Sequence, residues 1–195
     1  MDRFVVRVEL PDRPGALGLV ASRVGAVRGE IVGIDILECA AGRAVDELVV
    51  ELPDSSLLEL LVGEVTAVDG VEVDDVRPVP SGGRDPRLDA LETAVHLTEA
   101  TSIDTLLESL VVSAQRALQA DLAVVEDESP IPPALEDDVA RVSMPSAGVA
   151  LVLRRAGRRF RSRELAQLSA LARIADVRWR ELSGRAATDG RDHPQ

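Results

Sequence analysis

The sequence predicts an α+β fold arranged as two domains, and three observations lead to this prediction. The chain has 195 residues, which at ~100–200 residues per domain is enough for one or two domains. Its first 80 residues alternate strand-like and helix-like patterns in the order β-α-β-β-α-β. A short linker-like stretch, Ser-Gly-Gly-Arg-Asp-Pro at 81–86, separates them from a second set of elements. We therefore expect domains at residues 1–80 and 87–184, and a disordered polar tail at 185–195.

The composition predicts a protein of the cell interior. Hydrophobic residues make up 46% of the chain, but with 2 Phe, 1 Trp and no Tyr the cores must be built from aliphatic side chains. The net charge of −12 disfavours general binding of nucleic acid, which needs clustered cations. With no signal-peptide pattern and no long apolar run, we expect a cytoplasmic protein without a membrane partner. Cys39 is the single cysteine, so we expect no disulfide and a small buried thiol. All 22 basic residues are Arg, which indicates a GC-rich bacterial genome.

The first domain is predicted from its apolar periodicities and its turn residues. The expected elements are a strand at 4–11, a helix at 14–27, strands at 30–38 and 45–52, a helix at 55–68 and a strand at 71–79. Pro14 suits the first helical position, and Gly29 suits the stop after the helix.

An internal repeat supports this order of elements. The pentapeptide Val8–Asp12 recurs letter for letter as Val50–Asp54, each time at the end of a strand and before a helix. Two equivalent β-α units predict the ferredoxin-like βαββαβ arrangement, which is one antiparallel sheet with both helices on one face.

Residues 3–79 resemble an ACT domain, a small regulatory module that senses amino acids in many metabolic enzymes. The resemblance is carried by the turn Asp12–Leu17, by Gly29, and by Ile31, Ile34 and Asp35 on the second strand. The family's turn often has Asn where this chain has Asp12, and its serine-binding members have His where this chain has Leu10. The second departure argues against recognition of serine in that mode.

The strand-to-helix turn is the candidate ligand site, because a helix N-terminus presents free backbone N–H groups to an anion. Behind the turn residue Pro14, the amides of Gly15, Ala16 and Leu17 would face a ligand carboxylate. Asp12 would then receive the ligand's ammonium, and Arg13 could pair with a second carboxylate. The alternative is that Asp12 only caps the helix while Pro14 and Gly15 only form the turn.

The ACT resemblance also implies a homodimer. In such modules the ligand commonly lies between two domains, one supplying the turn and the other the second strand. This chain has one such domain, so the second half of the site would come from a second copy. Its wall would be formed by Gly29, Ile31, Val32 and Gly33. Asp35 is either part of that wall or a solvent-facing strand residue.

The second domain is predicted to begin with two helices and to end with one. Leu88, Leu91 and Val95 are expected to line the first helix, with His96 partly buried beside them. The further elements are a second helix lined by Leu106, Leu110 and Ala114, a strand at 121–126, an irregular segment at 128–133, strands at 139–144 and 148–153, and a helix at 162–182. In this order residues 88–184 resemble a small GAF domain, shortened in the part that usually builds a pocket and keeping the helices that pair subunits.

The residues with catalytic chemistry are few. The two histidines, His96 and His193, have no neighbours at metal-ligand or catalytic-triad spacing, and no phosphate-binding glycine motif is present. We therefore expect no enzyme, no metal and no cofactor. Residues 154–163 hold six arginines, which would bind an anion, dock onto the acidic first domain or form a solvated loop. Nucleic acid is a poor fit because stacking aromatics are scarce.

Together these observations predict a homodimeric sensor that binds an amino acid or a related carboxylate and leaves the ligand's identity open. The alternative is an adaptor in which both domains serve dimerisation and docking of a protein partner.

Overall fold

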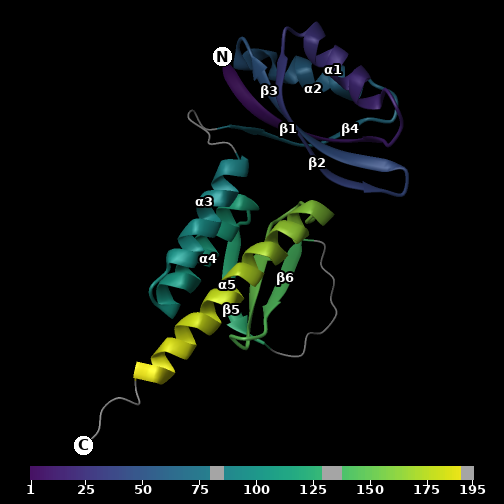
Figure 1. The fold of residues 1–195 in the computed structure, drawn as a ribbon. Helices are drawn as coiled ribbons and strands as arrows, with labels where there is room; N and C mark the ends of the chain where they lie inside the picture. The colour runs from purple at the N-terminus through teal and green to yellow at the C-terminus, as the bar shows by residue number, and fades with distance from the viewer. Residues whose placement is uncertain (80–85, 129–137, 190–195) are drawn as a thin grey trace, which may run out of the picture. The chain divides into compact units, whose positions relative to one another are not determined.

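The computed structural model describes residues 1–79, 86–128 and 138–189. The chain divides into two compact units, Met1–Gly83 and Arg84–Gln195, which are drawn in Figure 1. The expected linker at 81–86 lies outside the described residues except for Pro86, which begins a helix.

The first unit has the predicted βαββαβ order. Its elements are β1 (Asp2–Pro11), α1 (Ala16–Ala26), β2 (Glu30–Ala40), β3 (Arg43–Leu52), a 3₁₀ turn (Ser55–Leu57), α2 (Leu58–Thr66) and β4 (Glu72–Pro78). The strands form one antiparallel sheet in the order β2-β3-β1-β4. Both helices cover the same face of this sheet (Figure 1). This is the ferredoxin-like arrangement, and the fold prediction is confirmed.

Alternation along the two central strands builds the core of the first unit. Every second residue of β1 and β3 points at the helices, and the helices return apolar residues every three or four positions. The best-buried members of this core are Val6, Val8, Val20, Val24, Leu48, Val50, Leu52, Leu61 and Val65. Aliphatic side chains therefore fill most of the space between the sheet and the helices, together with Phe4 of β1.

The start of α1 differs from the prediction. Residues 13–16 form a turn closed by the Ala16 amide on the Arg13 carbonyl at 3.2 Å, with Gly15 at φ 88° and ψ −12°. This is a type II turn, which favours Pro at its second position and Gly at its third. The helix therefore begins at Ala16, and the prediction that Pro14 is its first residue is wrong. No side chain caps this helix, so the capping alternative for Asp12 is also wrong.

The end of α1 is closed by a pair of backbone hydrogen bonds. The Arg28 amide donates to the Gly25 carbonyl and the Gly29 amide to the Val24 carbonyl, both at 3.0 Å, with Arg28 at φ 61°. This is a Schellman motif, in which the left-handed residue is Arg28. A Cβ on Gly29 would lie 2.9 Å from Val24 Cγ1. Glycine is therefore required at position 29 by close packing.

The repeated pentapeptide is used differently in its two copies. Asp54 accepts a hydrogen bond from the Ser56 amide at 2.8 Å and caps the turn that leads into α2. The hydrogen bonds from Ser56 hold the pKa of Asp54 below its usual value. Asp12, at the same place in the first copy, caps nothing. The difference arises because Arg13-Pro14-Gly15 inserts a turn before the helix.

The second unit packs three helices with a separate three-stranded sheet. Its elements are α3 (Pro86–Glu99), α4 (Ile103–Ala117), β5 (Leu122–Asp127), β6 (Val139–Met144), β7 (Val149–Arg154) and α5 (Ser162–Asp189). The antiparallel strand order is β5-β7-β6. Leu106, Leu110 and Ala114 of α4 are fully buried, as predicted.

Three predictions for the second unit are corrected. Leu88, Leu91 and Val95 are exposed, and α3 instead buries Thr93 and Leu97. His96 is exposed as well. The more apolar stripe of α3 is thus the outer one. The last helix extends to Asp189 rather than Leu182, so residues 185–189 are helical and not a disordered tail. Residues 190–195, and the expected irregular segment from 129 on, lie outside the described residues.

The arginine-rich stretch contains the main polar anchor of the second unit. Arg155 is 1% exposed and makes a two-pronged ion pair with Glu164, at 2.7 and 3.0 Å. It also donates to the carbonyl of Leu118 at the end of α4 and to that of Arg159, and its guanidinium lies 4.3 Å from the ring centroid of Phe160. Arg155 therefore ties α4, β7 and the start of α5 together. It is a structural residue and not part of a solvated loop.

We expect Glu164→Ala to lower the free energy of unfolding of the second unit by about 3 kcal/mol, because it leaves a buried guanidinium without its counter-ion. Trp179, the one tryptophan of the chain, packs against this core, so its fluorescence during chemical denaturation reports the change. The control is Glu126→Ala, which removes an exposed pair with Arg141 (3.1 Å) and should cost less than about 1 kcal/mol. Equal losses in the two variants would contradict the role assigned to Arg155.

Candidate functional site

The predicted ligand turn lies on the surface at the start of α1. Asp12, Arg13, Pro14 and Gly15 are exposed, Ala16 is buried in the core, and Leu17 is half-buried. The Asp12 amide donates to the Gly42 carbonyl at 2.9 Å, which fixes the turn to the tip of the β2–β3 hairpin. Ala41 and Gly42 form that tip with φ values of 52° and 76°, as a two-residue type I′ hairpin requires. The site is thus held between two tight turns.

Three amide groups of this turn are available to a ligand. Within the described part of the chain, the N–H groups of Gly15, Leu17 and Gly18 donate to no acceptor, and the first turn of α1 contains no acidic side chain. The positive end of the helix dipole is therefore uncompensated. A Cβ built on Gly15 or Gly18 would meet no atom within 4 Å. Unsatisfied amides at a helix start are a candidate anion site.

Asp46 is a site residue that the sequence reasoning missed. It lies on β3 between Ala44 and Leu48, on the helix-facing side, and is 3% exposed. Its Oδ1 has no hydrogen-bond partner among the described residues. Burial raises the pKa of Asp46, and the nearby Asp12 carboxylate raises it further. The sequence did contain a signal for this residue, because Asp46 is an acidic residue at a position of β3 where the alternation of the strand predicts a buried side chain.

Cys39 borders the same region and differs from its prediction. It pairs in register with Ala44 and is exposed rather than buried. Partial desolvation raises the pKa of its thiol, and the nearby carboxylates of Asp12 and Asp46 raise this pKa further. A thiol with a raised pKa stays protonated at neutral pH and is a weak nucleophile. Cys39 is therefore a neutral neighbour of the site and not its reactive group.

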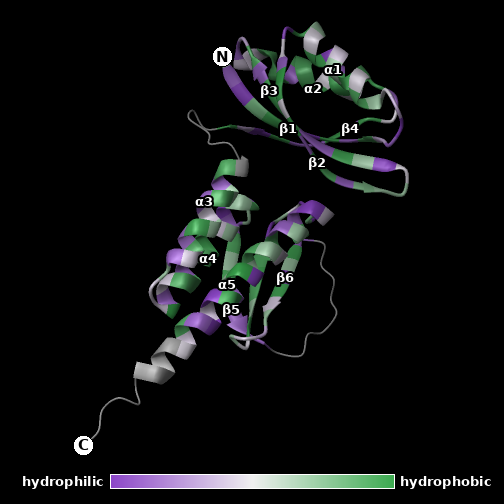
Figure 2. Cartoon of the chain, viewed as in Figure 1, coloured by the Kyte–Doolittle hydropathy of each residue, from purple (hydrophilic) through white to green (hydrophobic). Residues whose placement is uncertain are grey.

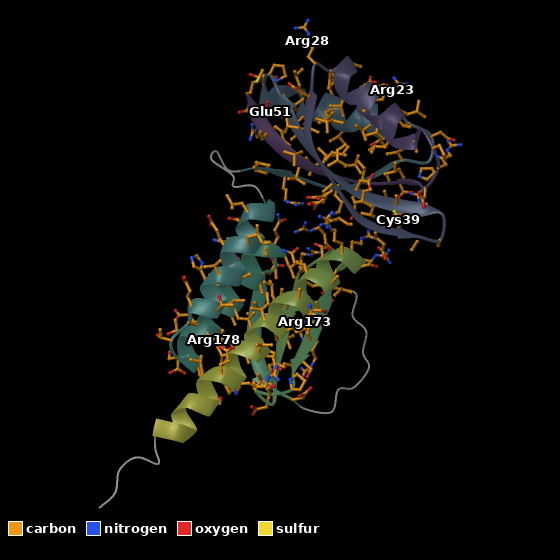
Figure 3. All side chains as sticks on the ribbon, in the orientation of Figure 1. Arg23, Arg28, Cys39, Glu51, Arg173 and Arg178 are labelled. Carbon is orange, nitrogen blue, oxygen red and sulfur yellow. The ribbon has the colours of Figure 1, made fainter. Side chains whose placement is uncertain are left out.

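The two predicted halves of the site do not meet within one chain. Gly29, Ile31, Val32 and Gly33 follow the C-terminal end of α1, whereas the turn precedes its N-terminal end. The 11 residues of α1 separate the two groups by roughly 16 Å. In Figure 3, Arg28 and Cys39 mark the opposite ends of β2, and the turn is fixed to the hairpin end.

The exposed apolar residues of β2 include only one of the predicted wall residues, Val32. Ile31 packs against the core, and a Cβ on Gly33 would lie 3.3 Å from Val49 Cγ2. Val32, Ile34 and Ile36 are 45%, 45% and 52% exposed. Because β2 is an edge strand, only one of its two sides pairs with another strand of the described sheet. Figure 2 shows hydrophobic segments alternating with hydrophilic ones along it.

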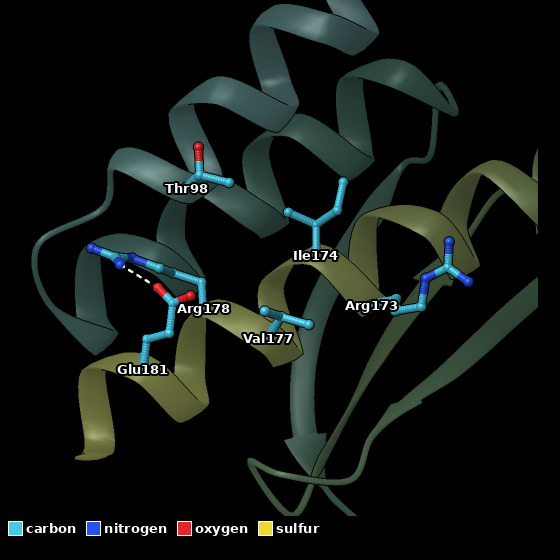
Figure 4. A pocket seen from close by; sticks show the side chains of 6 residues that line it. All are labelled: Thr98, Arg173, Ile174, Val177, Arg178 and Glu181. Carbon is cyan, nitrogen blue, oxygen red and sulfur yellow. Dashed lines mark hydrogen bonds and ion pairs between the residues drawn. The ribbon is translucent and has the colours of Figure 1, made fainter. Parts of the chain in front are cut away.

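A concavity lies between α3 and α5 in the second unit. It has a volume of about 330 Å³, and Ile174 and Val177 of α5 and Thr98 of α3 form part of its lining (Figure 4). Part of its polar lining is already engaged, since Arg178 donates to the Ala100 carbonyl and pairs with Glu181 at 2.6 Å. Arg173 also lines this mainly apolar groove.

The described residues contain neither a candidate metal site nor a candidate membrane-spanning helix. No group of three or more His, Cys, Asp or Glu side chains is placed to hold a metal ion there. No helix in that part of the chain has the length and apolarity needed to cross a membrane.

Comparisons with known proteins return structures but no sequence family. No family model matches the chain, and no curated protein matches it. The ACT domain of a GTP pyrophosphokinase from Chlorobium tepidum is 18% identical, with a TM-score of 0.33, covering 40% of this chain and 99% of that one. An ACT domain protein from Streptococcus pneumoniae is 14% identical (TM-score 0.35; 43% and 97% covered).

Two of the similar structures span both units. A protein provisionally assigned as a glycine cleavage system transcriptional repressor is 13% identical, with a TM-score of 0.34, covering 90% of this chain and 92% of its own. The fold of the first unit rests on its own strand order and does not need these matches. The GAF resemblance of residues 88–184 stays a prediction.

We expect Asp46→Asn to stabilise the first unit by about 1 kcal/mol at pH 7, because it removes a buried charge without a partner. The raised pKa means that the folded state binds this proton more tightly than the unfolded state does. The cost of the carboxylate is therefore absent below its ordinary pKa of about 4 and grows as the pH rises through the folded value.

Calorimetric unfolding at pH 4 and pH 7 measures this effect, and the gain should shrink toward pH 4. The exposed Asp69→Asn is the control, with an expected change within about 0.5 kcal/mol. A marked loss of stability in Asp46→Asn at pH 7 would mean that the carboxylate has a favourable partner in the free protein.

Proposed function

We propose that this chain is a non-enzymatic regulatory protein that binds an amino acid or a related carboxylate at the start of α1. The observation that carries the proposal is the set of unsatisfied amides of Gly15, Leu17 and Gly18 beside open space. The ligand carboxylate would lie against these amides, in the field of the helix dipole. Arg13, which is exposed at the turn, would pair with a second carboxylate on a dicarboxylic ligand.

The proposal includes a homodimer built through β2. An exposed apolar edge strand favours pairing with another strand, and Val32, Ile34 and Ile36 supply an apolar face for it. A two-fold axis at this edge would make the contact isologous and would create two equivalent sites. Ligand binding would then regulate by favouring one arrangement of the subunits over another, through its different affinity for the two.

A second candidate function is an adaptor for a protein partner. It is favoured by the exposed stripe Leu88, Leu91 and Val95 on α3 and by the neighbouring apolar groove between α3 and α5. Ligand-induced thermal stabilisation separates the two candidates. A sensor is stabilised by its ligand increasingly as the ligand concentration rises above Kd, whereas the adaptor responds to none of the twenty amino acids.

We expect Gly18→Glu to raise the stability of the free protein and to abolish ligand binding. Glutamate improves helix propensity and complements the dipole, together worth about 1 kcal/mol, but its carboxylate occupies the anion site. Isothermal titration against the twenty amino acids measures binding, with Kd below ~1 mM (about −4 kcal/mol) as the criterion.

The matched control is Gly63→Glu in α2, another exposed helical glycine with open space at its Cβ. It should gain stability and keep wild-type affinity. Unchanged affinity in Gly18→Glu would remove the helix N-terminus from the mechanism.

We expect the double variant Ile34→Lys/Ile36→Lys to be monomeric, because two ammonium groups on an edge strand oppose strand pairing. Sedimentation velocity compares it with the wild-type chain, which should be a dimer. Val112→Lys, an equivalent change at an exposed residue of α4, should leave the dimer intact. A wild-type monomer, or a dimer that survives both lysines, would contradict a β2 interface.

A further inference from the structure

Asp46 is a buried carboxylate whose Oδ1 has no hydrogen-bond partner among the described residues. A carboxylate that is 3% exposed normally has an ion-pair or hydrogen-bond partner, because an unpaired buried charge is costly. Within the described residues Oδ1 of Asp46 has no partner. The neighbours that act on it electrostatically do not help, since Asp12 is acidic and Cys39 is a neutral thiol. What the position lacks is a cationic donor.

The place of Asp46 links it to the turn. It pairs in register with Val8 of β1, two positions before the pair of Leu10 and Ala44. That strand end leads into the turn, whose Asp12 is held to the hairpin tip by its amide. Asp12 and Cys39 are both exposed, and both interact electrostatically with the buried Asp46. The unsatisfied donors at the start of α1 and the unsatisfied acceptor on β3 thus lie toward the same end of the first unit.

The unsatisfied amides of α1 and the unpartnered carboxylate of Asp46 are complementary to one ligand class. An α-amino acid carries a carboxylate and an ammonium on a single carbon, so one small molecule can satisfy amides and a carboxylate together. A simple carboxylate would satisfy the amides alone and would add a third negative charge beside Asp12 and Asp46. The buried acid therefore selects for a ligand that brings its own cation.

We propose that Asp46 is the ammonium-binding residue of the site, so that the ligand is a free amino acid rather than a carboxylate without an amine. This inference rests on the proposed function and deepens it. Asp46 thus replaces Asp12 as the proposed partner of the ligand's ammonium. The exposed Asp12 carboxylate adds negative electrostatic potential to the site.

The test compares amino acids with their deaminated counterparts. Each of the twenty amino acids that binds the wild-type chain is titrated beside the same carboxylic acid without its α-amino group, on wild type, Asp46→Asn and the exposed control Asp69→Asn. We expect the deaminated acid to bind wild type at least 10-fold more weakly. Asp46→Asn should lose at least 10-fold in affinity for the amino acid. It should bind the deaminated acid no more weakly than wild type does, because the substitution removes one of the negative charges that oppose a simple carboxylate. Asp69→Asn should match wild type.

The outcomes separate this inference from the function on which it rests. If amino acids bind Asp46→Asn as tightly as wild type, or if deaminated acids bind wild type equally well, the role of Asp46 is overturned while the carboxylate site stands. If neither class binds wild type, the proposed function fails and the inference fails with it. Thermal unfolding of Asp46→Asn verifies folding, and the variant should be at least as stable as wild type, so that lost binding is not lost structure.

Discussion

The first unit depends on one constraint, which is that the chain must leave β1 and enter α1 through Arg13-Pro14-Gly15. Proline fixes the second position of the turn, and glycine takes the left-handed conformation at the third. The helix therefore starts without a capping side chain, and the amides of Leu17 and Gly18 donate to no acceptor among the described residues. The same turn is fastened to the hairpin tip, where β3 with its buried Asp46 begins, through the Asp12 amide. The free amides of the candidate site follow from this junction.

The region is poorly satisfied by the standards of a folded core. Donors at a helix start and an acceptor on a buried strand both lack partners among the described residues, although each costs stability. Arg155 in the second unit provides a contrast, because it pairs with Glu164 and with backbone carbonyls. Asp46 has no comparable partner among the described residues, and a local inconsistency of this kind is expected at a functional site.

Much of the fold could be predicted from the sequence, because β1, β3 and α4 show strong apolar periods and because the Val8–Asp12 repeat indicated two β-α units. The exposed face of α3 could not, since Leu88, Leu91 and Val95 form its more apolar stripe and hydropathy alone assigns that stripe to the core. The turn residues were correctly located but their geometry was not, because the sequence Pro14-Gly15 fits both a helix start and a type II turn. Asp46 was missed because the search looked for motifs and not for a charge at an inward strand position.

The central claim is that a small carboxylate binds at the start of α1, and the amide resonances of that turn test it most directly. In ¹H–¹⁵N correlation spectra, the twenty amino acids are added one at a time to the labelled full chain. For at least one of them, the account predicts saturable shifts of the Gly15, Leu17 and Gly18 amides that are larger than those of any residue in the second unit. Spectra that stay unchanged for all twenty, or shifts confined to α3 and α5, would contradict it.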